Sequence, residues 1–245
     1  MKSSTTLLSK LFLSLFVTVS LISCRTSIDF GEEKGNGNIT TEKRNLTENF
    51  EKIRVSSGIE VIVSQADVIS IEVETDENIQ PIILTKVENG TLIITADESF
   101  DTKQNPKVRV NLPIISGLKS SSGSSIQSRS NLKSTSLIVD SSSGSSIEIE
   151  VETDYISLES SSGSSISVKG KALKAETASS SGSTINAGNL MANDVFSQTS
   201  SGSSTQVYPI ISLNGKASSG SKITYMNVPK NLQKEESSGG SITKD

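Results

Sequence analysis

Few residue types in this chain could do covalent chemistry. The sequence has no histidine, and Cys24 is its single cysteine. Ser-His-Asp and Cys-His catalysis both need an imidazole, and ordinary zinc sites need histidine or cysteine ligands. The composition therefore excludes these mechanisms and these metal sites, and nothing in it indicates a cofactor.

Two Ser-x-x-Lys segments could in principle support Ser-Lys hydrolysis. They are Ser116 to Lys119 and Ser130 to Lys133. In a chain this rich in serine and lysine such spacings arise by chance, so they carry little weight.

Carboxylate chemistry is the second possibility. A glycosidase needs two acids roughly 5–9 Å apart in a cleft. The candidates are Asp140, Glu150, Asp154 and Glu159, which have no flanking signature. A β-helical polysaccharide lyase would combine acidic calcium ligands with basic catalytic residues, but Arg109 and Arg129 are the only arginines after Arg54. Calcium-binding solenoid repeats place Asp beside glycine, whereas this chain places Ser there. An enzyme that processes polysaccharides is therefore the least favoured function.

Aromatic platforms for sugar binding are also scarce. The chain has no tryptophan, and the candidates are Tyr155, Tyr208, Tyr225, Phe196 and Phe100. Packing or capping is the better interpretation of each. Long strand faces rich in Ser, Thr and Asn could still bind a glycan or a protein through many weak hydrogen bonds, or pair with each other. No basic run suggests a nucleic-acid partner.

A Ser-Ser-Gly repeat is the strongest feature of the sequence. Its glycines are Gly123, Gly144, Gly163, Gly182, Gly202, Gly220 and Gly239, separated by 21, 19, 19, 20, 18 and 19 residues. Gly58 ends an apolar version of the same motif. Repeats of about 20 residues with strand patterning and no helical pattern predict an all-β fold, a right-handed parallel β-helix or β-solenoid with about 19–21 residues per turn. A Ser-rich sandwich or barrel and a flexible Ser/Gly linker are the alternatives.

Period-two alternation around the glycines argues against a linker. One repeat gives Leu137, Val139, Ser141, Ser143, Ser145, Ile147, Ile149 and Val151 on one face, and the third gives Leu173, Ala175, Thr177, Ser179, Ser181 and Ser183. This count predicts that the serine before each glycine points inward and fills a slim core. These serines are Ser122, Ser143, Ser162, Ser181, Ser201, Ser219 and Ser238. Each glycine would permit a sharp bend or a positive φ.

The regions on either side of the repeats complete the predicted organisation. Residues 46–245 form a single solenoid domain, with N-terminal turns or a cap over residues 46–116 and Ser-Gly repeat turns over residues 117–245. Asn89-Gly90 between two apolar runs predicts a hairpin turn. The charged tail, with Lys234, Glu235 and Glu236, could protect the far end of the stack.

The N-terminus predicts export. Lys2 and Lys10 precede an apolar stretch that ends at Leu21-Ile22-Ser23-Cys24, which is similar to a bacterial lipobox. We therefore expect a signal peptide over residues 1–23, lipid on Cys24, and a flexible linker over residues 24–45. An ordinary secreted protein and a retained membrane anchor are the alternatives. The lipid would attach the chain to the membrane.

Several segments together resemble the putative auto-transporter adhesin, head GIN domain family, found as lipoproteins of Bacteroidetes. They are Phe50 to Gln65 (FEKIRVSSGIEVIVSQ), Asp76-Glu77-Asn78-Ile79, Asn89-Gly90-Thr91-Leu92 and the later Ser-Gly repeats, over residues 48–230. The resemblance implies a β-helical fold, an envelope location and an adhesin role, without catalytic residues.

These observations predict an outer-membrane lipoprotein that acts as a non-catalytic, adhesin-like binding module. Its glycan or protein ligand and its orientation to the surface or the periplasm are left open. A periplasm-facing structural or stress-linked scaffold is the alternative. The solenoid ends are a candidate surface for homo-oligomers.

Overall fold

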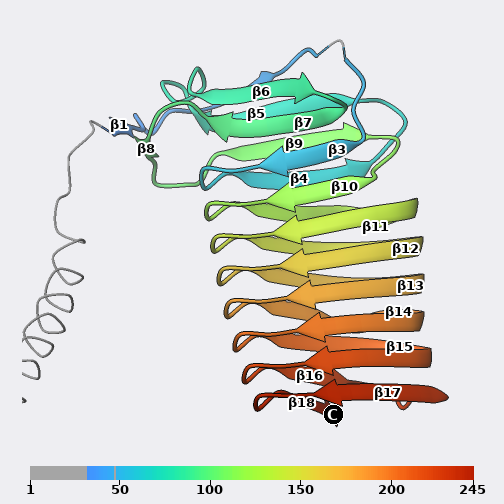
Figure 1. Cartoon of the computed structure of the whole chain (residues 1–245). Coiled ribbons are helices and arrows are strands. Elements are labelled where there is room, and N and C mark those ends of the chain that lie inside the picture. Colours follow the sequence, from blue (N-terminus) through green and yellow to red (C-terminus); the bar gives the residue numbers. More distant parts are fainter. Residues whose placement is uncertain (1–31, 47) are drawn as a thin grey trace, which may run out of the picture. The chain divides into compact units, whose positions relative to one another are not determined.

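Strands with period-two burial build the folded part of the chain. The computed structural model describes residues 32–46 and 48–245, and every regular element in these ranges is a strand. Residues 33–245 form one unit with a continuous buried core, wound as a β-solenoid of about seven turns (Figure 1). The predicted signal peptide, Cys24 and the start of the predicted linker lie outside the described residues. In the described ranges, nothing forms a helix that could span a membrane.

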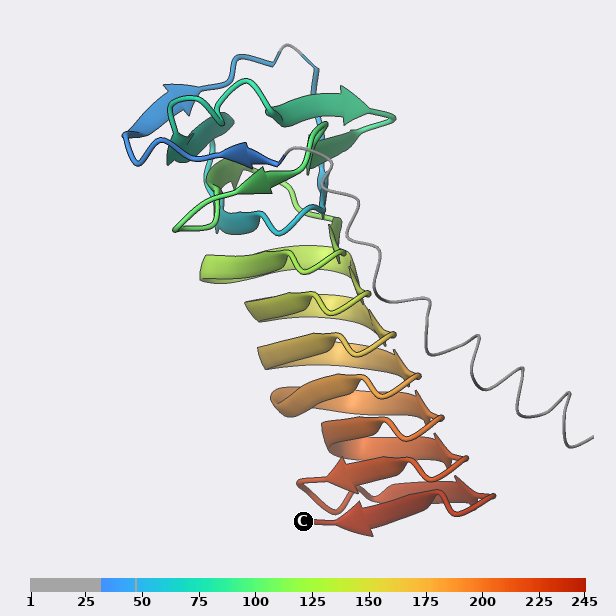
Figure 2. The ribbon, with the colours of Figure 1, turned by 90° about the vertical axis from the view of Figure 1, so that its left-hand side faces the viewer.

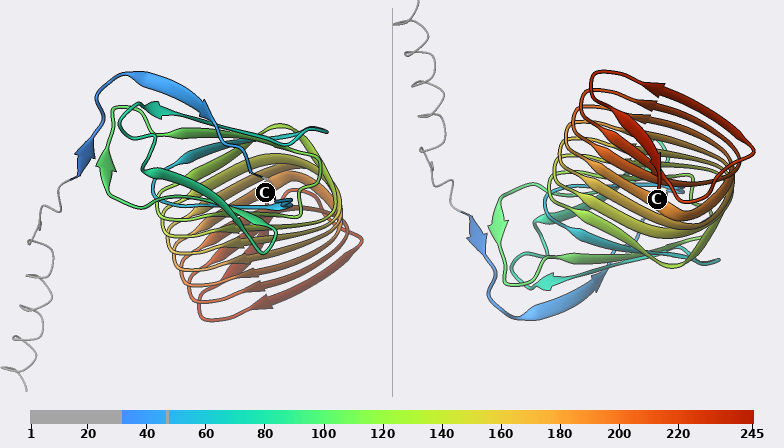
Figure 3. Two further views of the ribbon diagram at one scale, coloured as in Figure 1. Left: turned by 90° about the horizontal axis from the view of Figure 1, so that it is seen from above. Right: turned by 90° about the horizontal axis from the view of Figure 1, so that it is seen from below.

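Five long strands carry most of the repeat. They are β11 (Ser125–Ser141), β12 (Ser146–Ser160), β13 (Ser165–Ser179), β14 (Thr184–Thr199) and β15 (Ser204–Ala217). Each pairs in parallel with the next, with partners 17 to 21 residues apart. Seen along the stack, successive turns superimpose as one flattened loop (Figure 3). The predicted solenoid and its period are confirmed.

Each turn of the solenoid doubles back at a Ser-Gly pair. Ser143 and Gly144 have φ values of +54° and +70°, and the Ser145 N–H donates to the Ser142 carbonyl at 3.2 Å. Two consecutive positive φ values define the type I′ turn that joins twisted strands. The same positive φ pair recurs at every Ser-Gly turn from Ser57-Gly58 to Ser238-Gly239. The edge formed by these turns is visible in Figure 2.

The predicted inward position of the serine before each glycine is wrong. Ser122, Ser143, Ser162, Ser181, Ser201, Ser219 and Ser238 are all exposed at the turn tips. The type I′ turn makes the serine and the glycine at its tip both point outward. Alternation therefore fails only at the serine before the glycine, and at Ser143, for example, the serines two residues before and after it stay inside. Leu173, also predicted inside, is 56% exposed because β13 bends at this corner and the inward positions continue from Ala172 to Ala175.

The serines two residues on either side of these tips fill the core instead. Ser141, Ser160, Ser164 and Ser183 are all buried. Ser164 Oγ lies 2.6 Å from the Ser141 carbonyl oxygen and accepts a hydrogen bond from the Ser161 N–H at 3.1 Å. Such bonds offset the cost of burying a hydroxyl. Not every buried serine forms such a bond, because the buried hydroxyls of Ser120, Ser124 and Ser203 have no partner among the described residues.

The N-terminal region begins the stack and then covers it. The strands are β1 (Glu33–Lys34), β2 (Ile39–Lys43), β3 (Lys52–Val55), β4 (Glu60–Gln65), β5 (Ser70–Asp76), β6 (Ile83–Glu88), β7 (Thr91–Ala96), β8 (Phe100–Asp101), β9 (Lys107–Leu112) and β10 (Gly117–Ser120). Parallel pairing of β3 with β7 and of β4 with β9 adds a turn above the first Ser-Gly turn. Antiparallel β2, β5 and β6 lie beyond it.

Two details of this region bear on the predictions. Asn89 and Gly90, with φ of +50° and +71°, form the predicted hairpin turn between β6 and β7. The predicted flexible linker over residues 24–45 is wrong in its second half, because β2 pairs with β5 from Ile39 to Lys43. Its polar, exposed side chains gave no apolar signal, so backbone pairing alone places this segment in the sheet.

The C-terminal end of the stack is closed in part by charged side chains. The last strands are β16 (Lys222–Tyr225), β17 (Asn231–Glu236) and β18 (Ser241–Lys244). Lys234 Nζ donates to the Ile242 carbonyl at 2.7 Å, and Glu236 Oε1 accepts from the Ile242 N–H at 2.6 Å. Since the Ser241 N–H already points back to Ser221, the Ile242 groups face the open end. These two side chains therefore cover backbone groups of an edge strand.

Removing both caps should expose that edge. We expect Lys234→Ala/Glu236→Ala to fold but to associate or aggregate more readily with rising concentration, because an uncovered strand edge is a template for pairing. Light scattering against concentration measures this. The control Lys222→Ala/Lys230→Ala removes exposed charges from the same end of the stack and should scatter like the parent chain; equal scattering by both variants would contradict the capping role.

Candidate binding surface

The strand segments that lead into the Ser-Gly turns form a continuous outward face, here called the pre-turn face. Its most regular feature is a column of residues that are paired one to the next across seven strands. This charge column consists of Lys119, Asp140, Glu159, Ala178, Gln198, Lys216 and Glu235. Parallel pairing in register places successive members about 4.8 Å apart.

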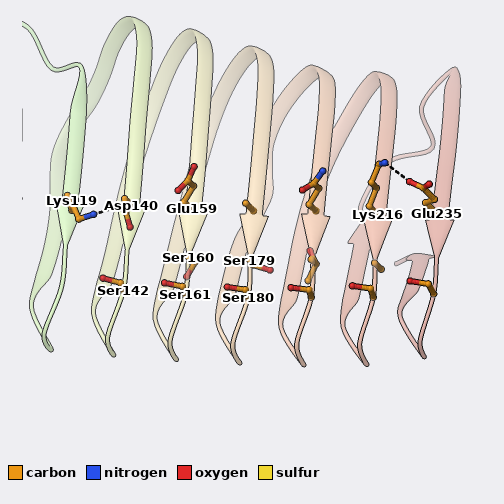
Figure 4. A pocket seen from close by; sticks show the side chains of 17 residues that line it. Lys119, Asp140, Ser142, Glu159, Ser160, Ser161, Ser179, Ser180, Lys216 and Glu235 are labelled. Atoms are coloured by element: carbon orange, nitrogen blue, oxygen red, sulfur yellow. Dashed lines mark hydrogen bonds and ion pairs between the residues drawn. The ribbon is translucent and has the colours of Figure 1, made fainter.

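Two ion pairs lie at the first two and the last two members of the charge column, and the same register continues beyond Lys119 to the exposed Arg54 on β3. Lys119 Nζ lies 2.5 Å from Asp140 Oδ2, and Lys216 Nζ lies 2.6 Å from Glu235 Oε2 (Figure 4). The pairs are partly exposed, so each contributes little to folding stability. Their regular placement makes them more informative about recognition than about stability.

A column of serines runs beside the charge column. Its members are Ser142, Ser161, Ser180, Ser200, Ser218 and Ser237. Together with the charge column they line an open groove of about 730 Å³ (Figure 4). Within the described residues, no protein group forms a hydrogen bond with any of these six hydroxyls. They are free to bond an external ligand.

A polar cluster lies on the same face, in the two outward columns next to the charge column. Lys174 Nζ is 2.6 Å from Glu176 Oε1, and the Tyr155 hydroxyl is 3.0 Å from Glu176 Oε2. The hydrogen bond from Lys174 lowers the pKa of Glu176 below its ordinary value, and the same bond raises the pKa of Lys174. Burial, followed by the bond to Glu176, raises the pKa of Tyr155. At neutral pH the cluster is thus an ion pair that also accepts a bond from a protonated tyrosine.

The two Ser-x-x-Lys segments do not form a Ser-Lys pair in the part of the chain that the structure describes. Lys119 points at Asp140, and Lys133 lies 3.7 Å from Glu152; in the described residues neither lysine bonds its predicted serine partner. Ser116 and Ser130 instead contact backbone groups of Glu51 and Gln65. In the described residues, neither Ser116 nor Ser130 is therefore activated by a lysine.

Two of the four acidic candidates are brought together, because Asp140 and Glu159 are register partners on β11 and β12 and line the same groove. The other acidic and basic candidates are dispersed. Glu150 pairs with Lys169 at 3.2 Å, and Asp154 lies exposed at the corner of the stack. Arg109 pairs with Glu74 at 2.9 Å in the N-terminal region, and Arg129 is exposed on β11. The described residues contain no cluster of acids suited to a metal ion.

The aromatic candidates divide between packing and surface. Tyr225 is buried beneath Lys234, and Phe100 packs against the core. Tyr208 is half-buried. Tyr155 and Phe196 are half-buried on the pre-turn face, where they are available to a ligand.

An apolar corner lies where the two faces of the solenoid meet. Leu173, Met191, Ile210 and Ile211 are each 38–56% exposed on three successive strands. Leu173, Met191 and Ile210 line a hollow of about 510 Å³, whose rim includes Glu152 and Asp154.

The sequence interpretation missed the charge column, although a signal for it exists. Every member lies four residues before a repeat glycine, as Lys119 does before Gly123 and Glu235 before Gly239. The residue type at this position varies from repeat to repeat, so neither the serine pattern nor the apolar pattern marks it. Its meaning depends on the pairing register, which aligns the seven residues.

Comparison with known proteins identifies a family and several solved structures with the same fold. The family model for the putative auto-transporter adhesin, head GIN domain, matches residues 49–229. A crystal structure of a putative adhesin from Bacteroides fragilis superposes with a TM-score of 0.81 at 18% identity, covering 86% of this chain and 99% of that one. No curated protein matches the chain.

Two further solved structures come from Parabacteroides. One, from Parabacteroides distasonis, is named a putative lipid binding protein and has a TM-score of 0.73 at 20% identity, covering 87% of this chain and 99% of that one. The other, a putative adhesin from Parabacteroides merdae, has a TM-score of 0.71 at 19% identity with the same coverage. At these identities the likeness concerns the fold alone.

Proposed function

Since the chain belongs to the putative auto-transporter adhesin, head GIN domain family, we propose that it is a non-catalytic, adhesin-like binding module of the cell envelope. In this proposal lipid on Cys24 holds the chain at the outer membrane, and the solenoid presents its binding surface to the exterior.

The pre-turn face is the observation that carries the proposal. It combines an open groove of about 730 Å³, six hydroxyls that form no hydrogen bond with residues 32–46 or 48–245, and charged residues toward both ends. Many evenly spaced polar groups favour an extended ligand that bonds at several successive strands.

Filling the groove tests the binding role. Ala178 lies at the middle of the charge column, so Ala178→Arg places a long side chain in the groove without removing a core residue. We expect this variant to lose most binding to surfaces coated with glycans or matrix proteins. Ser167→Arg is the matched control because Ser167 is exposed on the opposite face. Equal adhesion by both variants would count against the groove.

Protease treatment of intact cells tests the orientation. An outward-facing adhesin is cut from the cells, whereas a periplasm-facing scaffold survives until the outer membrane is opened. Survival of the chain on intact cells would therefore replace the adhesin proposal with the scaffold.

A further inference from the structure

We propose that the pre-turn face binds a second copy of this chain, with the two solenoids antiparallel, so that the adhesin-like contact is homophilic. This inference rests on the proposed function and names its partner. The order of charges along the charge column carries it.

From Lys119 to Glu235 the charge column is complementary to its own reverse. Arg54, the next register partner beyond Lys119 on β3, projects past Glu235 of the second copy. Read from β10 to β17, its charges are positive, negative, negative, neutral, neutral, positive and negative. A two-fold axis that passes through Ala178 along the strand direction reverses the order in the partner. Lys119 then faces Glu235 of the second copy, and Asp140 faces Lys216. Glu159 faces the amide of Gln198, and the small Ala178 meets itself.

Each end of such a pair forms a square of four alternating charges. Lys119 and Asp140 are already joined within one copy, and so are Lys216 and Glu235. The two-fold brings the first pair against the second pair of the other copy, with each charge beside two opposite ones. On the axis itself, Glu176 and Lys174 of β13 face the same residues of the second copy. Each Glu176 keeps its own Lys174 at 2.6 Å, so two ion pairs meet rather than two bare carboxylates.

The size of the face favours weak, salt-sensitive pairing. Six steps of about 4.8 Å give the column a length of about 29 Å, and the four columns from Ser136 to Ser142 span about 20 Å. The resulting flat area of roughly 580 Å² per copy is below the roughly 800 Å² of a standard interface. Rows of exposed charges also lose strength in salt. Stable contact between two surfaces would then depend on many copies acting together.

The antiparallel arrangement gives the pairing a direction. The chain enters the solenoid unit at Glu33, at the same end as the N-terminal strands. Reversal of one stack places the two Glu33 residues at opposite ends of the pair. Copies held through their N-termini on opposing surfaces meet this condition, so the contact is suited to joining two surfaces.

Charge exchange within each ion pair provides a sharp test. Variant one is Lys119→Glu/Asp140→Lys, and variant two is Lys216→Glu/Glu235→Lys. Each variant exchanges the two signs of one ion pair and leaves the other ion pairs unchanged. Every ion pair within the chain can therefore still form, so folding should be preserved, as a thermal melt verifies. In a homodimer of either variant, like charges face each other at both ends. A one-to-one mixture restores opposite charges at both ends, and so does the chain that carries all four substitutions.

The measurements use residues 33–245, which contain the whole described core, in sedimentation velocity at low salt. We expect each double variant to self-associate at least about tenfold more weakly than the parent, and the mixture and the quadruple variant to recover. Beads coated through the N-terminus should cluster in the same pattern. A monomeric parent chain, or a quadruple variant as weak as the double variants, would overturn the homophilic contact.

The two proposals fail separately. A parent chain that stays monomeric but binds glycan or matrix surfaces through the groove refutes the second copy as the occupant and keeps the binding module. A parent chain that pairs in the expected pattern but binds no foreign surface supports homophilic contact. Loss of both the pairing and the foreign binding refutes both proposals.

Discussion

Ser164→Leu is expected to destabilise the solenoid by about 2–6 kcal/mol. The Ser164 side chain is 2% exposed, and its Oγ is close to the Ser141 and Ser161 carbonyl oxygens and the Ser161 N–H. Leucine removes that bonding, at a cost of about 1–3 kcal/mol. It also forces extra methylene groups into a narrow core, which costs typically about 1–3 kcal/mol and occasionally more. Chemical denaturation of residues 33–245 measures the change.

Two neighbouring serines supply the controls. Ser165→Leu changes the next residue, which points outward, and Ser162→Ala changes the exposed tip of the turn. Both should stay within about 1 kcal/mol of the parent chain, as surface substitutions do. A large loss of folding stability in Ser162→Ala and none in Ser164→Leu would show instead that the serine before the glycine points inward, as alternation alone predicts.

Gly170→Ala is expected to cost more than about 3 kcal/mol of stability. Gly170 has φ of +120°, and a Cβ built on it would lie 2.0 Å from the carbonyl oxygen of Val151 on the neighbouring strand. The conformation is strained for any L side chain, and the backbone oxygen cannot move without breaking the pairing of β12 with β13. A shift in the thermal or urea midpoint measures the effect.

Gly182→Ala is the matched comparison for a glycine with positive φ. Its φ is +70°, and nothing lies within 4 Å of the added Cβ. Only conformational strain remains, so we expect a loss of about 1–2 kcal/mol. If Gly170→Ala were no worse than Gly182→Ala, the close approach to Val151 would not limit this position.

Much of the architecture could be predicted from the sequence because it is periodic. Regular glycine spacing and period-two patterning predicted the solenoid, its period and the hairpin at Asn89-Gly90. Both signals are local, because a turn type and an alternating strand are determined within a few residues. Positions far from a turn, such as Val139 and Ile147, were accordingly assigned to the correct side.

The sequence failed where local geometry interrupts the period. The paired positive φ values at Ser143 and Gly144 turn two successive residues outward, and the corner of β13 places Leu173 outside. The exposed strand β2 carries no apolar pattern, so its pairing with β5 could not be read from composition. In each case a backbone contact or bend overrides the side-chain pattern.

By itself the sequence determined which residue types are available: serine, glycine and scattered charges, without histidine and with one cysteine. Those choices restrict the covalent chemistry and specify repeated turns. Only the tertiary structure decided which residues become neighbours across strands. Parallel pairing converts residues about 20 positions apart into contacts about 4.8 Å apart, so seven separate residues from Lys119 to Glu235 become one ordered line of charge. The physical reason is that charge complementarity depends on distance through space, and the register of the strands sets that distance.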